Sequence, residues 1–353
     1  MWPLADAALA KTPVRLFLAD RLDRRLVVLN ELRAGLSERT GVDVRLAYSL
    51  KTNPDPRVLR PVQAADWWVE VISDAEYDLA RRYFEPGSII RNGPVPGRGD
   101  RAVRWTFADS EGALAAAAPA LNDEIGLRLR PNGGQSRFGI ELTDDKALSR
   151  VAALLRSAAR PIAVSMHVQA SVVGKKTWRT LAATFLRQSE QLARCSGAPV
   201  RVVNFGGGFE PHDLDVFLER DAEAHIDMAR GKFPALEVVV LEPGKALVQD
   251  AMALVARAVE IRRRGRPEIV VDAALADLPM ARYRRHPVWA RRFDGRWLQL
   301  VRGDGRILGR TCMEHDIVAT AVDLPSWIEV DTPLLFDACG AYDASMAHRF
   351  GLG

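Results

Sequence analysis

Several short segments combine an apolar run with a residue that could carry chemistry at its end. Lys51 follows Ala47-Tyr48-Ser49-Leu50. Burial lowers the pKa of a lysine, and the neutral amine can then form an imine with an aldehyde. A glycine run, Gly206-Gly207-Gly208, also follows an apolar segment and could bring backbone N–H groups close to an anion such as phosphate. The plainer alternatives are a strand-end lysine that reaches solvent and a tight turn that needs positive φ.

Two further segments have the same organisation. In Leu241-Glu242-Pro243-Gly244-Lys245, a Pro-Gly turn would fix the Glu242 carboxylate so that it can accept a hydrogen bond from a ring N–H. Lys245 could neutralise a phosphate. His167 ends another apolar run, and its imidazole could lie flat on an aromatic ring. A surface acid and a structural histidine are the alternatives.

The elements that must position these residues alternate between strand and helix. Between the β-rich runs lie segments with helical periodicity, such as Asp74–Tyr83, Asp145–Ala158 and Thr177–Cys195. Parallel strands need crossover connections, so eight such runs favour a (β/α)8 TIM barrel of the alanine-racemase type over an open doubly wound sheet. The eight runs are Arg45–Leu50, Trp67–Ile72, Ser88–Arg91, Trp105–Ala108, Ile125–Arg130, Ala163–His167, Val202–Phe205 and Glu237–Leu241.

Barrel enzymes place their chemistry at the carboxyl ends of the strands. Lys51, His167, the glycine run and Glu242 follow the first, sixth, seventh and eighth runs, so all of them are expected at one mouth of the barrel. An imine-forming lysine, a phosphate cradle and a carboxylate for a ring nitrogen together describe one ligand, pyridoxal 5′-phosphate (PLP).

The pattern changes after Leu241. Ala246–Arg262 has no clear helix stop, which predicts that a helix continues through it. Short β-rich runs then predict an antiparallel sheet, to which Val14–Ala19 could add a strand. We therefore expect a PLP-binding barrel over residues 25–245 and a mostly β domain over residues 246–353 plus about 1–24. The predicted strands are Glu268–Val271, Trp297–Val301, Asp316–Ala321, Trp327–Val330 and Leu334–Asp337.

Composition excludes several classes of protein. The 353 residues carry 49 basic and 45 acidic side chains, and a net charge of +4 gives no reason to expect a nucleic-acid or membrane partner. No apolar run reaches the length of a membrane span, and the first residues lack a signal-peptide pattern. Three cysteines without metal-ligand spacing predict no metal site and a reduced, cytoplasmic protein.

The motifs, in this order, resemble those of the fold-type III PLP decarboxylases, the group of ornithine, diaminopimelate and biosynthetic arginine decarboxylases. The resemblance covers nearly the whole chain. It rests on Ala47–Pro54, Glu70–Glu76, Ile90–Pro94, Leu127–Pro131, Ser136–Ile140, Ser165–Val168, Asn204–Phe209, Glu242–Lys245, Val271-Asp272, Gly309–Cys312 and Gly340–Tyr342.

The resemblance implies a role for each candidate residue. Lys51 would hold PLP as an aldimine, His167 would stack on the ring, and Glu242 would pair with the pyridinium nitrogen. Cys312 would cross a homodimer interface and protonate the quinonoid carbon after the α-carboxylate leaves. The other cofactor contacts would come from Glu76, Arg128, Gly206, Gly207, Gly208, Tyr342 and Lys245, which stands where the family usually has arginine.

The segments expected to bind substrate depart from the family pattern. The family usually has an acidic residue directly after the cysteine, where it holds a distal ammonium, but Met313 stands there and Glu314 follows. Arg282 and Tyr283 are displaced from the family's substrate loop. Arg282 also belongs to a basic cluster with Arg284, Arg285 and His286, which is a solvated face or a binder of a distal carboxylate. The implied substrate is an amino acid related to diaminopimelate or ornithine, with a distal group modified as in a siderophore or specialised-metabolite intermediate.

Two alternatives remain at this point. An amino-acid racemase of the same barrel type would need a second base, and the Cys312 motif argues against it. A non-catalytic relative that binds a partner protein would tend to lose the lysine, which this chain retains. The chain also ends at residue 353, where the resembled enzymes continue into a further strand, so the last domain is expected to be trimmed.

Overall fold

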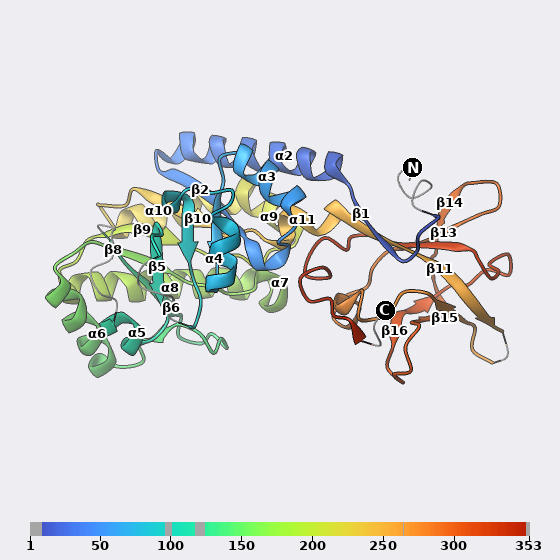
Figure 1. The fold of residues 1–353 in the computed structure, drawn as a ribbon. Helices are drawn as coiled ribbons and strands as arrows, with labels where there is room; N and C mark the ends of the chain where they lie inside the picture. The colour runs from blue at the N-terminus through green and yellow to red at the C-terminus, as the bar shows by residue number, and fades with distance from the viewer. Residues whose placement is uncertain (1–8, 96–100, 117–123, 264, 351–353) are drawn as a thin grey trace. The chain divides into compact units, whose positions relative to one another are not determined.

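The computed structural model describes residues 9–95, 101–116, 124–263 and 265–350. The chain divides into two units (Figure 1). Arg24–Leu247 form the first, called here the barrel unit. The residues up to Asp23 and those from Val248 onward form the second, the β unit.

Eight parallel strands close into a barrel in the first unit. Their order is β5-β4-β3-β2-β10-β9-β8-β6, and β5 pairs with β6 to close the circle, while the two-residue β7 (Ile140–Glu141) adds to β6. Each predicted run overlaps one barrel strand, so the TIM-barrel prediction is confirmed and the open sheet is wrong. The strands are β2 (Asp43–Ser49), β3 (Trp68–Val71), β4 (Ile89–Arg91), β5 (Trp105–Ala108), β6 (Ile125–Arg130), β8 (Ile162–Ser165), β9 (Val200–Asn204) and β10 (Val238–Leu241).

Apolar side chains fill the barrel interior. The two tryptophans of the interior, Trp68 and Trp105, meet edge to face with ring centroids 5.4 Å apart. Small residues from neighbouring strands leave room for them. The buried cluster contains Ala47, Trp68, Ile90, Trp105, Phe107, Ala163, Val202 and Val240.

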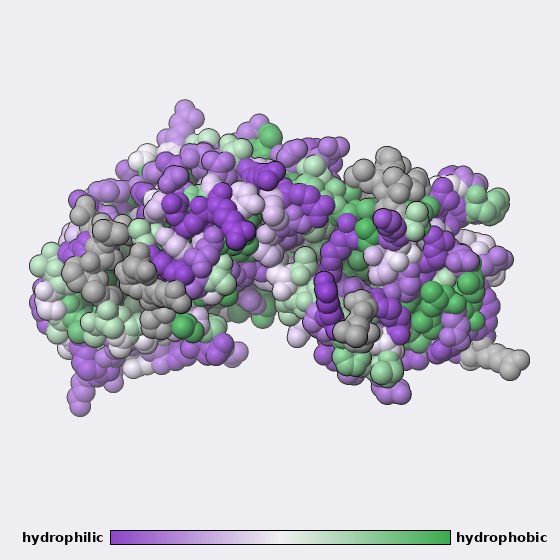
Figure 2. Space-filling view, in the orientation of Figure 1, coloured by the Kyte–Doolittle hydropathy of each residue, from purple (hydrophilic) through white to green (hydrophobic). Residues whose placement is uncertain are grey.

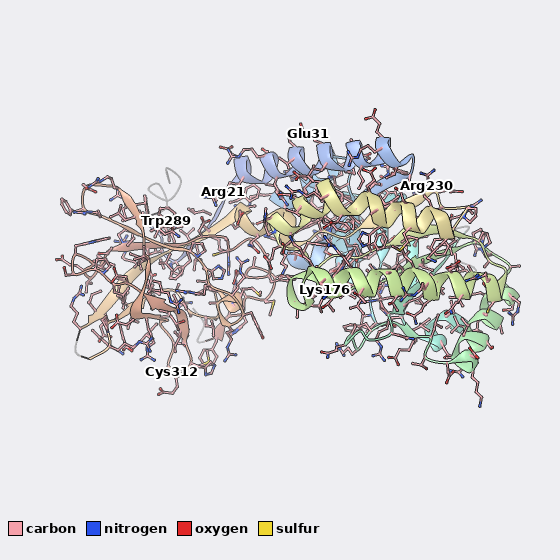
Figure 3. The ribbon with its side chains drawn as sticks, turned by 180° about the vertical axis from the view of Figure 1, so that it is seen from behind. Arg21, Glu31, Lys176, Arg230, Trp289 and Cys312 are labelled. Carbon is pink, nitrogen blue, oxygen red and sulfur yellow. The ribbon has the colours of Figure 1, made fainter. Side chains whose placement is uncertain are left out.

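Helices cover the outside of the barrel. Figure 3 shows α2, α10 and α8 on the outside, with Glu31, Arg230 and Lys176 marking them. Local signals set the ends of α6, because the Asp144 side chain accepts a hydrogen bond from the Ala147 amide and Ala159 adopts the left-handed conformation after the last turn. The helices are α2 (Ala19–Thr40), α3 (Pro56–Ala64), α4 (Asp74–Ala80), α5 (Glu111–Ala116), α6 (Asp145–Ala158), α7 (Ala170–Val173), α8 (Lys175–Ser196), α9 (Pro211–Val216), α10 (Ala222–Lys232) and α11 (Lys245–Val248).

Shorter helical turns join these elements. A π-helical segment, η3 (Phe217–Asp221), links α9 to α10. The 3-10 turns are η1 (Leu50–Thr52), η2 (Pro86–Ser88), η4 (Gln249–Ala251) and η5 (Pro279–Arg282).

The β unit contains one sheet of eight strands. Their order is β14-β13-β17-β11-β12-β15-β16, and β1 also pairs with β11. The ladders are antiparallel except for β12 with β15. The strands are β1 (Val14–Phe17), β11 (Met252–Arg262), β12 (Glu268–Val271), β13 (Val288–Arg291), β14 (Trp297–Gln299), β15 (Arg302–Leu308), β16 (Ile317–Val322) and β17 (Pro333–Phe336).

Two predictions for this unit are wrong. The expected helix over Ala246–Arg262 ends at Val248, and the rest forms the long strand β11. Pairing with β1, β12 and β17 overrides the helical propensity of its alanines and leucine. Trp327–Val330 is not a strand, because Ile328 donates to the Pro325 carbonyl in a turn. The strands β13 and β15 were not predicted.

A polar group lies in the core of the β unit. His286 Nδ1 is 3.1 Å from the Asp337 carbonyl oxygen, and its Nε2 is 3.3 Å from Asp343 Oδ2. The Cys339 thiol packs 3.7 Å from the same ring and donates to the Phe336 carbonyl. All three side chains are buried, so burial raises the pKa of Cys339 well above its ordinary value.

Each unit presents a mixed surface. Figure 2 shows hydrophilic residues over most of the visible face of each unit, with hydrophobic residues between them. None of the helices in the described part of the chain is long and apolar enough to cross a membrane.

Candidate active site

Lys51 lies in η1, directly after β2. Its Nζ donates to Glu70 Oε2 at 2.5 Å and to Ser49 Oγ at 3.3 Å. Ser49 also donates to Glu70, whose side chain is fully buried in β3. The amine is therefore held at the carboxyl end of the barrel by a buried carboxylate, while 27% of the lysine side chain stays exposed.

Glu242 follows β10 and is buried, so it is not a surface acid. Its carboxylate accepts a hydrogen bond of 2.7 Å from Asn204 Nδ2 and lies 3.5 Å from His167 Nδ1. Burial opposes its ionisation. The hydrogen bond with His167, the charges of His167 and Lys51, and the Asn204 amide nevertheless hold the pKa of Glu242 below its ordinary value. The site thus contains a buried carboxylate that can accept a hydrogen bond from an N–H group.

The glycine run follows β9 and packs tightly on its neighbours. Gly206 and Gly208 have φ of +68° and +87°, which favour glycine. A Cβ on Gly207 would lie 2.1 Å from the Glu242 carbonyl oxygen. The Gly207 amide points to His167 Nδ1 at 3.4 Å. Both close approach and backbone conformation therefore require glycine here.

Lys245, at the start of α11, is linked to this loop. It donates to Ser171 Oγ at 2.8 Å and to the Glu210 carboxylate. The Ser171 amide in turn donates to the Gly208 carbonyl. Ser171 therefore links Lys245 to the glycine run, through its hydroxyl on one side and its backbone amide on the other.

Arg128 and His167 line the same cavity as Lys51, with a volume of about 780 Å³. Arg128 projects from β6 and is 8% exposed, and burial lowers its pKa against the favourable charges of Glu242, Glu70 and Asp109. No described carboxylate forms an ion pair with it. A buried guanidinium without an acidic partner is costly unless a bound anion neutralises it.

Glu76 lies in the first turn of α4. Its carboxylate accepts a hydrogen bond of 2.8 Å from the Ile72 amide, and Ile72 lines the cavity. Burial raises the pKa of Glu76 in spite of that hydrogen bond, and the nearby charge of Glu70 acts in the same direction.

Cys312 lies on an exposed loop of the β unit (Figure 3). The loop is fixed by Asp316, which is buried and accepts hydrogen bonds from the Thr311 amide and the Leu275 amide. Met313 is half-buried and Glu314 is exposed on the same loop. The thiol is thus exposed on a loop whose backbone is hydrogen-bonded to Asp316.

The other predicted residues of the β unit are spread over two segments. Tyr342 is half-buried with φ of +68°, an unusual conformation for a tyrosine. Arg282 and Tyr283 are exposed at the end of η5. The basic cluster is not one solvated face, because Arg284 donates to the Ala338 carbonyl and His286 is in the core.

Sequence reasoning missed two residues of the barrel site. Glu70, which holds Lys51, and Asn204, which holds Glu242, were considered only as parts of motifs. A signal for each was present. Glu70 is the one charged residue inside an otherwise apolar strand, and Asn204 is the last residue before the glycine loop.

Known proteins resemble this chain over almost its whole length. Diaminopimelate decarboxylase of Deinococcus radiodurans is 28% identical, with 96% of this chain and 87% of that protein covered. The crystal structure of diaminopimelate decarboxylase from M. jannaschii in complex with L-lysine matches with a TM-score of 0.82 at 19% identity, covering 99% and 87% of the two chains. No family model matches the sequence.

A viral enzyme shares the same fold. The arginine decarboxylase of Paramecium bursaria Chlorella virus, bound to agmatine, matches with a TM-score of 0.78 at 17% identity, covering 100% of this chain and 98% of that one. Together with the relatives above, this places the chain among barrel proteins with an added β domain. The chain is thus similar in sequence to diaminopimelate decarboxylases over almost its whole length, and it shares its fold with diaminopimelate and arginine decarboxylases.

Proposed function

We propose that the protein is a PLP-dependent decarboxylase that removes the α-carboxylate of an amino acid related to diaminopimelate or ornithine. The observation that carries this proposal is the meeting of Lys51, the glycine run and Glu242 at the carboxyl ends of β2, β9 and β10. The similarity to curated diaminopimelate decarboxylases supports the same reaction class.

The residues present fit the cofactor. Glu242 is a buried anion that can accept a ring N–H, and Arg128 is a buried cation that needs an anion. Lys51 would supply the amine for the aldehyde, His167 would contact the ring, and Glu76 would shape the pocket edge. The phosphate would be held by the backbone of Gly206, Gly207 and Gly208 with Lys245.

PLP, when bound, supplies an electron sink for the electron pair that the departing carboxylate leaves behind. Glu242, whose pKa is held below its ordinary value, would accept a hydrogen bond from the ring N–H and so favour the protonated ring nitrogen. Glu70 Oε2 lies within hydrogen-bond distance of Lys51 Nζ and can accept its proton, which frees the amine to react. Cys312 Sγ is the proposed donor of the proton that replaces the carboxylate on Cα.

The decisive experiment traps the tethered cofactor. Borohydride reduction of the PLP-loaded protein, followed by peptide mass spectrometry, should place the adduct on Lys51. Lys51→Ala should lose both the visible absorbance of the bound cofactor and carbon dioxide release, while Lys146→Ala, an exposed lysine of α6, should retain both. An adduct on another lysine contradicts the proposal.

The product distinguishes the alternatives. Carbon dioxide release supports the decarboxylase, whereas inversion at Cα without gas release would indicate a racemase. A protein that never develops cofactor absorbance after added PLP would be the non-catalytic relative.

The family resemblance also supports a cytoplasmic homodimer with shared active sites. Light scattering should then give about twice the 39.0 kDa mass of the chain. A monomer with full activity would contradict the shared site.

A further inference from the structure

Three side chains of the kinds that commonly bind metal ions meet in the core of the β unit. They are His286, just before β13, Cys339, just after β17, and Asp343, in the turn that follows. One candidate ligand atom from each lies within 4.8 Å of the other two. The side chains of His286 and Asp343 are 1% and 0% exposed, and Cys339 is also fully buried. The proposed decarboxylation uses none of these three groups.

The surroundings of His286 fix which ring nitrogen carries a proton. Nδ1 lies 3.1 Å from the Asp337 carbonyl oxygen, which can only accept a hydrogen bond, so Nδ1 is the donor. In a neutral imidazole the other nitrogen, Nε2, then carries a lone pair. Nε2 has no hydrogen-bond partner among the described residues. His286 therefore presents an unpaired ligand atom inside the core.

The group that faces this lone pair is a carboxylate. Asp343 Oδ2 lies 3.3 Å from His286 Nε2, and it also has no hydrogen-bond partner in the described part of the chain. The other oxygen, Oδ1, accepts a hydrogen bond of 2.9 Å from the Met280 amide. Two electron pairs that face each other in a buried space repel unless a cation lies between them. The cation is either a proton on His286 or a metal ion.

The contact geometry favours the metal ion over the proton. A proton on Nε2 would be donated in a hydrogen bond to Oδ2, and the two atoms form no such bond. In a metal site, the Nδ1–H of a histidine ligand is typically donated to a carbonyl or carboxylate oxygen, as it is here to the Asp337 carbonyl. The arrangement of His286 is therefore that of a histidine ligand.

Cys339 supplies the third ligand. Its Sγ lies 3.7 Å from His286 Nδ1. Neighbouring ligand atoms of a tetrahedral zinc ion lie about 3.3–3.6 Å apart, so the set closes if the sulfur approaches by about 1 Å or less. The positive charges of Arg15 and Arg284 act on this sulfur and favour the thiolate, which is the form that binds a metal.

We propose that His286, Cys339 and Asp343 bind a zinc ion that stabilises the β unit. Nitrogen, sulfur and carboxylate ligands suit Zn²⁺, and a thiolate with a carboxylate neutralises its charge. The fourth position of the tetrahedral ion is left for a water molecule or a main-chain oxygen. The proposal goes beyond the proposed decarboxylation and does not depend on it.

The site would be structural, because it is closed to solvent and joins separate segments. It would tie the start of β13 to the segment after β17. It would also hold Asp343, which caps the Met280 amide in η5 and directly follows Tyr342 with its left-handed φ of +68°. Loss of the ion should therefore loosen both η5 and the Tyr342 turn.

The metal content of the protein tests the site directly. Because a closed site fills during folding, the untagged protein is produced in zinc-supplemented medium, loaded with PLP and dialysed against a weak chelator. It should keep about one zinc ion per chain, with one sulfur ligand at about 2.3 Å by X-ray absorption. A protein that keeps no zinc overturns the proposal, and a proton then joins His286 to Asp343.

Variants distinguish this site from zinc bound elsewhere, such as on PLP. Cys339→Ser and Asp343→Asn should keep at least about tenfold less zinc than the unsubstituted protein. Cys195→Ser, which changes an exposed cysteine of α8, is the matched control and should keep the full amount. Equal zinc in Cys339→Ser and the control overturns the proposal.

Cobalt provides a measurement that needs no variant. The unsubstituted protein produced with Co²⁺ should show the absorbance of a thiolate bound to tetrahedral cobalt, and alkylation of the exposed cysteines Cys195 and Cys312 should leave it unchanged. A cobalt spectrum without a thiolate band, or one that alkylation abolishes, overturns the proposal even if the Cys339 variant fails to fold.

Discussion

In the barrel unit, Lys51, Glu242 and Lys245 each contact a polar or oppositely charged side chain of the same unit, whereas Cys312, Arg282 and Tyr283 of the β unit are exposed. The barrel residues follow strands whose ends share one rim. The β-unit residues lie on a loop and beside a 3-10 turn that the sheet supports from behind.

This difference in burial predicts that substitutions in the two regions change different properties of the protein. A buried, hydrogen-bonded charge contributes to the stability of the fold as well as to the site, because its removal leaves the partner group buried without a hydrogen bond. An exposed loop residue has few contacts to lose. Substitutions in the barrel site should therefore affect both unfolding and cofactor binding, and those on the Cys312 loop should affect turnover alone.

The largest expected effect compares two cysteines. Cys312→Ala should lower kcat by about a hundredfold or more, because the proposed proton donor is lost, while the melting temperature and cofactor absorbance stay unchanged. Cys339→Ala removes a buried sulfur that donates to the Phe336 carbonyl, so it should lower the free energy of unfolding by about 1–2 kcal/mol.

Steady-state kinetics and thermal unfolding of both variants provide the measurement. Full activity in Cys312→Ala would exclude the thiol as proton donor. Equal destabilisation by the two substitutions would contradict the contrast between exposed and buried cysteines.

A smaller effect is expected from glycines of the barrel unit. Gly207→Ala should lower the free energy of unfolding by about 1–3 kcal/mol and weaken PLP binding, because its Cβ would meet the Glu242 carbonyl. Gly231→Ala, within α10 and with no atom near its added Cβ, should raise stability by about 0.5–1 kcal/mol. Chemical denaturation would measure the stability of both variants, and PLP titration would measure their cofactor affinity. Unchanged stability and PLP affinity in Gly207→Ala would show that the loop can shift to accept the methyl group.

The smallest expected effect is a pair of opposite pH dependences. The folded-state pKa of Glu242 is lowered, so its contribution to stability is present above its ordinary value of 4.5 and is lost as the pH falls through the folded value. The pKa of Glu76 is raised, so its contribution is present below 4.5 and is lost as the pH rises.

Melting temperatures of Glu242→Gln and Glu76→Gln between about pH 3 and pH 7 should reveal the two signs. The deficit of Glu242→Gln relative to the unsubstituted protein should shrink toward low pH, and any advantage of Glu76→Gln should grow toward neutral pH. Parallel curves for the two variants would contradict the assigned environments.

Prediction from sequence succeeded where one local pattern corresponds to one structure. The eight apolar runs and the capped helix Asp145–Ala158 have the predicted positions, because strand period and capping residues act within a few residues. It failed for β11, whose alanine-rich sequence suits a helix until strands distant in sequence pair with it. It also missed β13 and β15, where apolar alternation is weak.

The sequence by itself determined which residues end the barrel strands, because chain order and strand direction place Lys51, the glycine run and Glu242 on one rim. Only the tertiary structure decided their electrostatic partners. The contacts of Glu70 with Lys51, of Asn204 with Glu242 and of Arg128 with the Phe138 ring depend on closure of the barrel and on side-chain packing. The physical reason is that charge interactions act through space, so their strength follows distance and burial, which no spacing along the chain records.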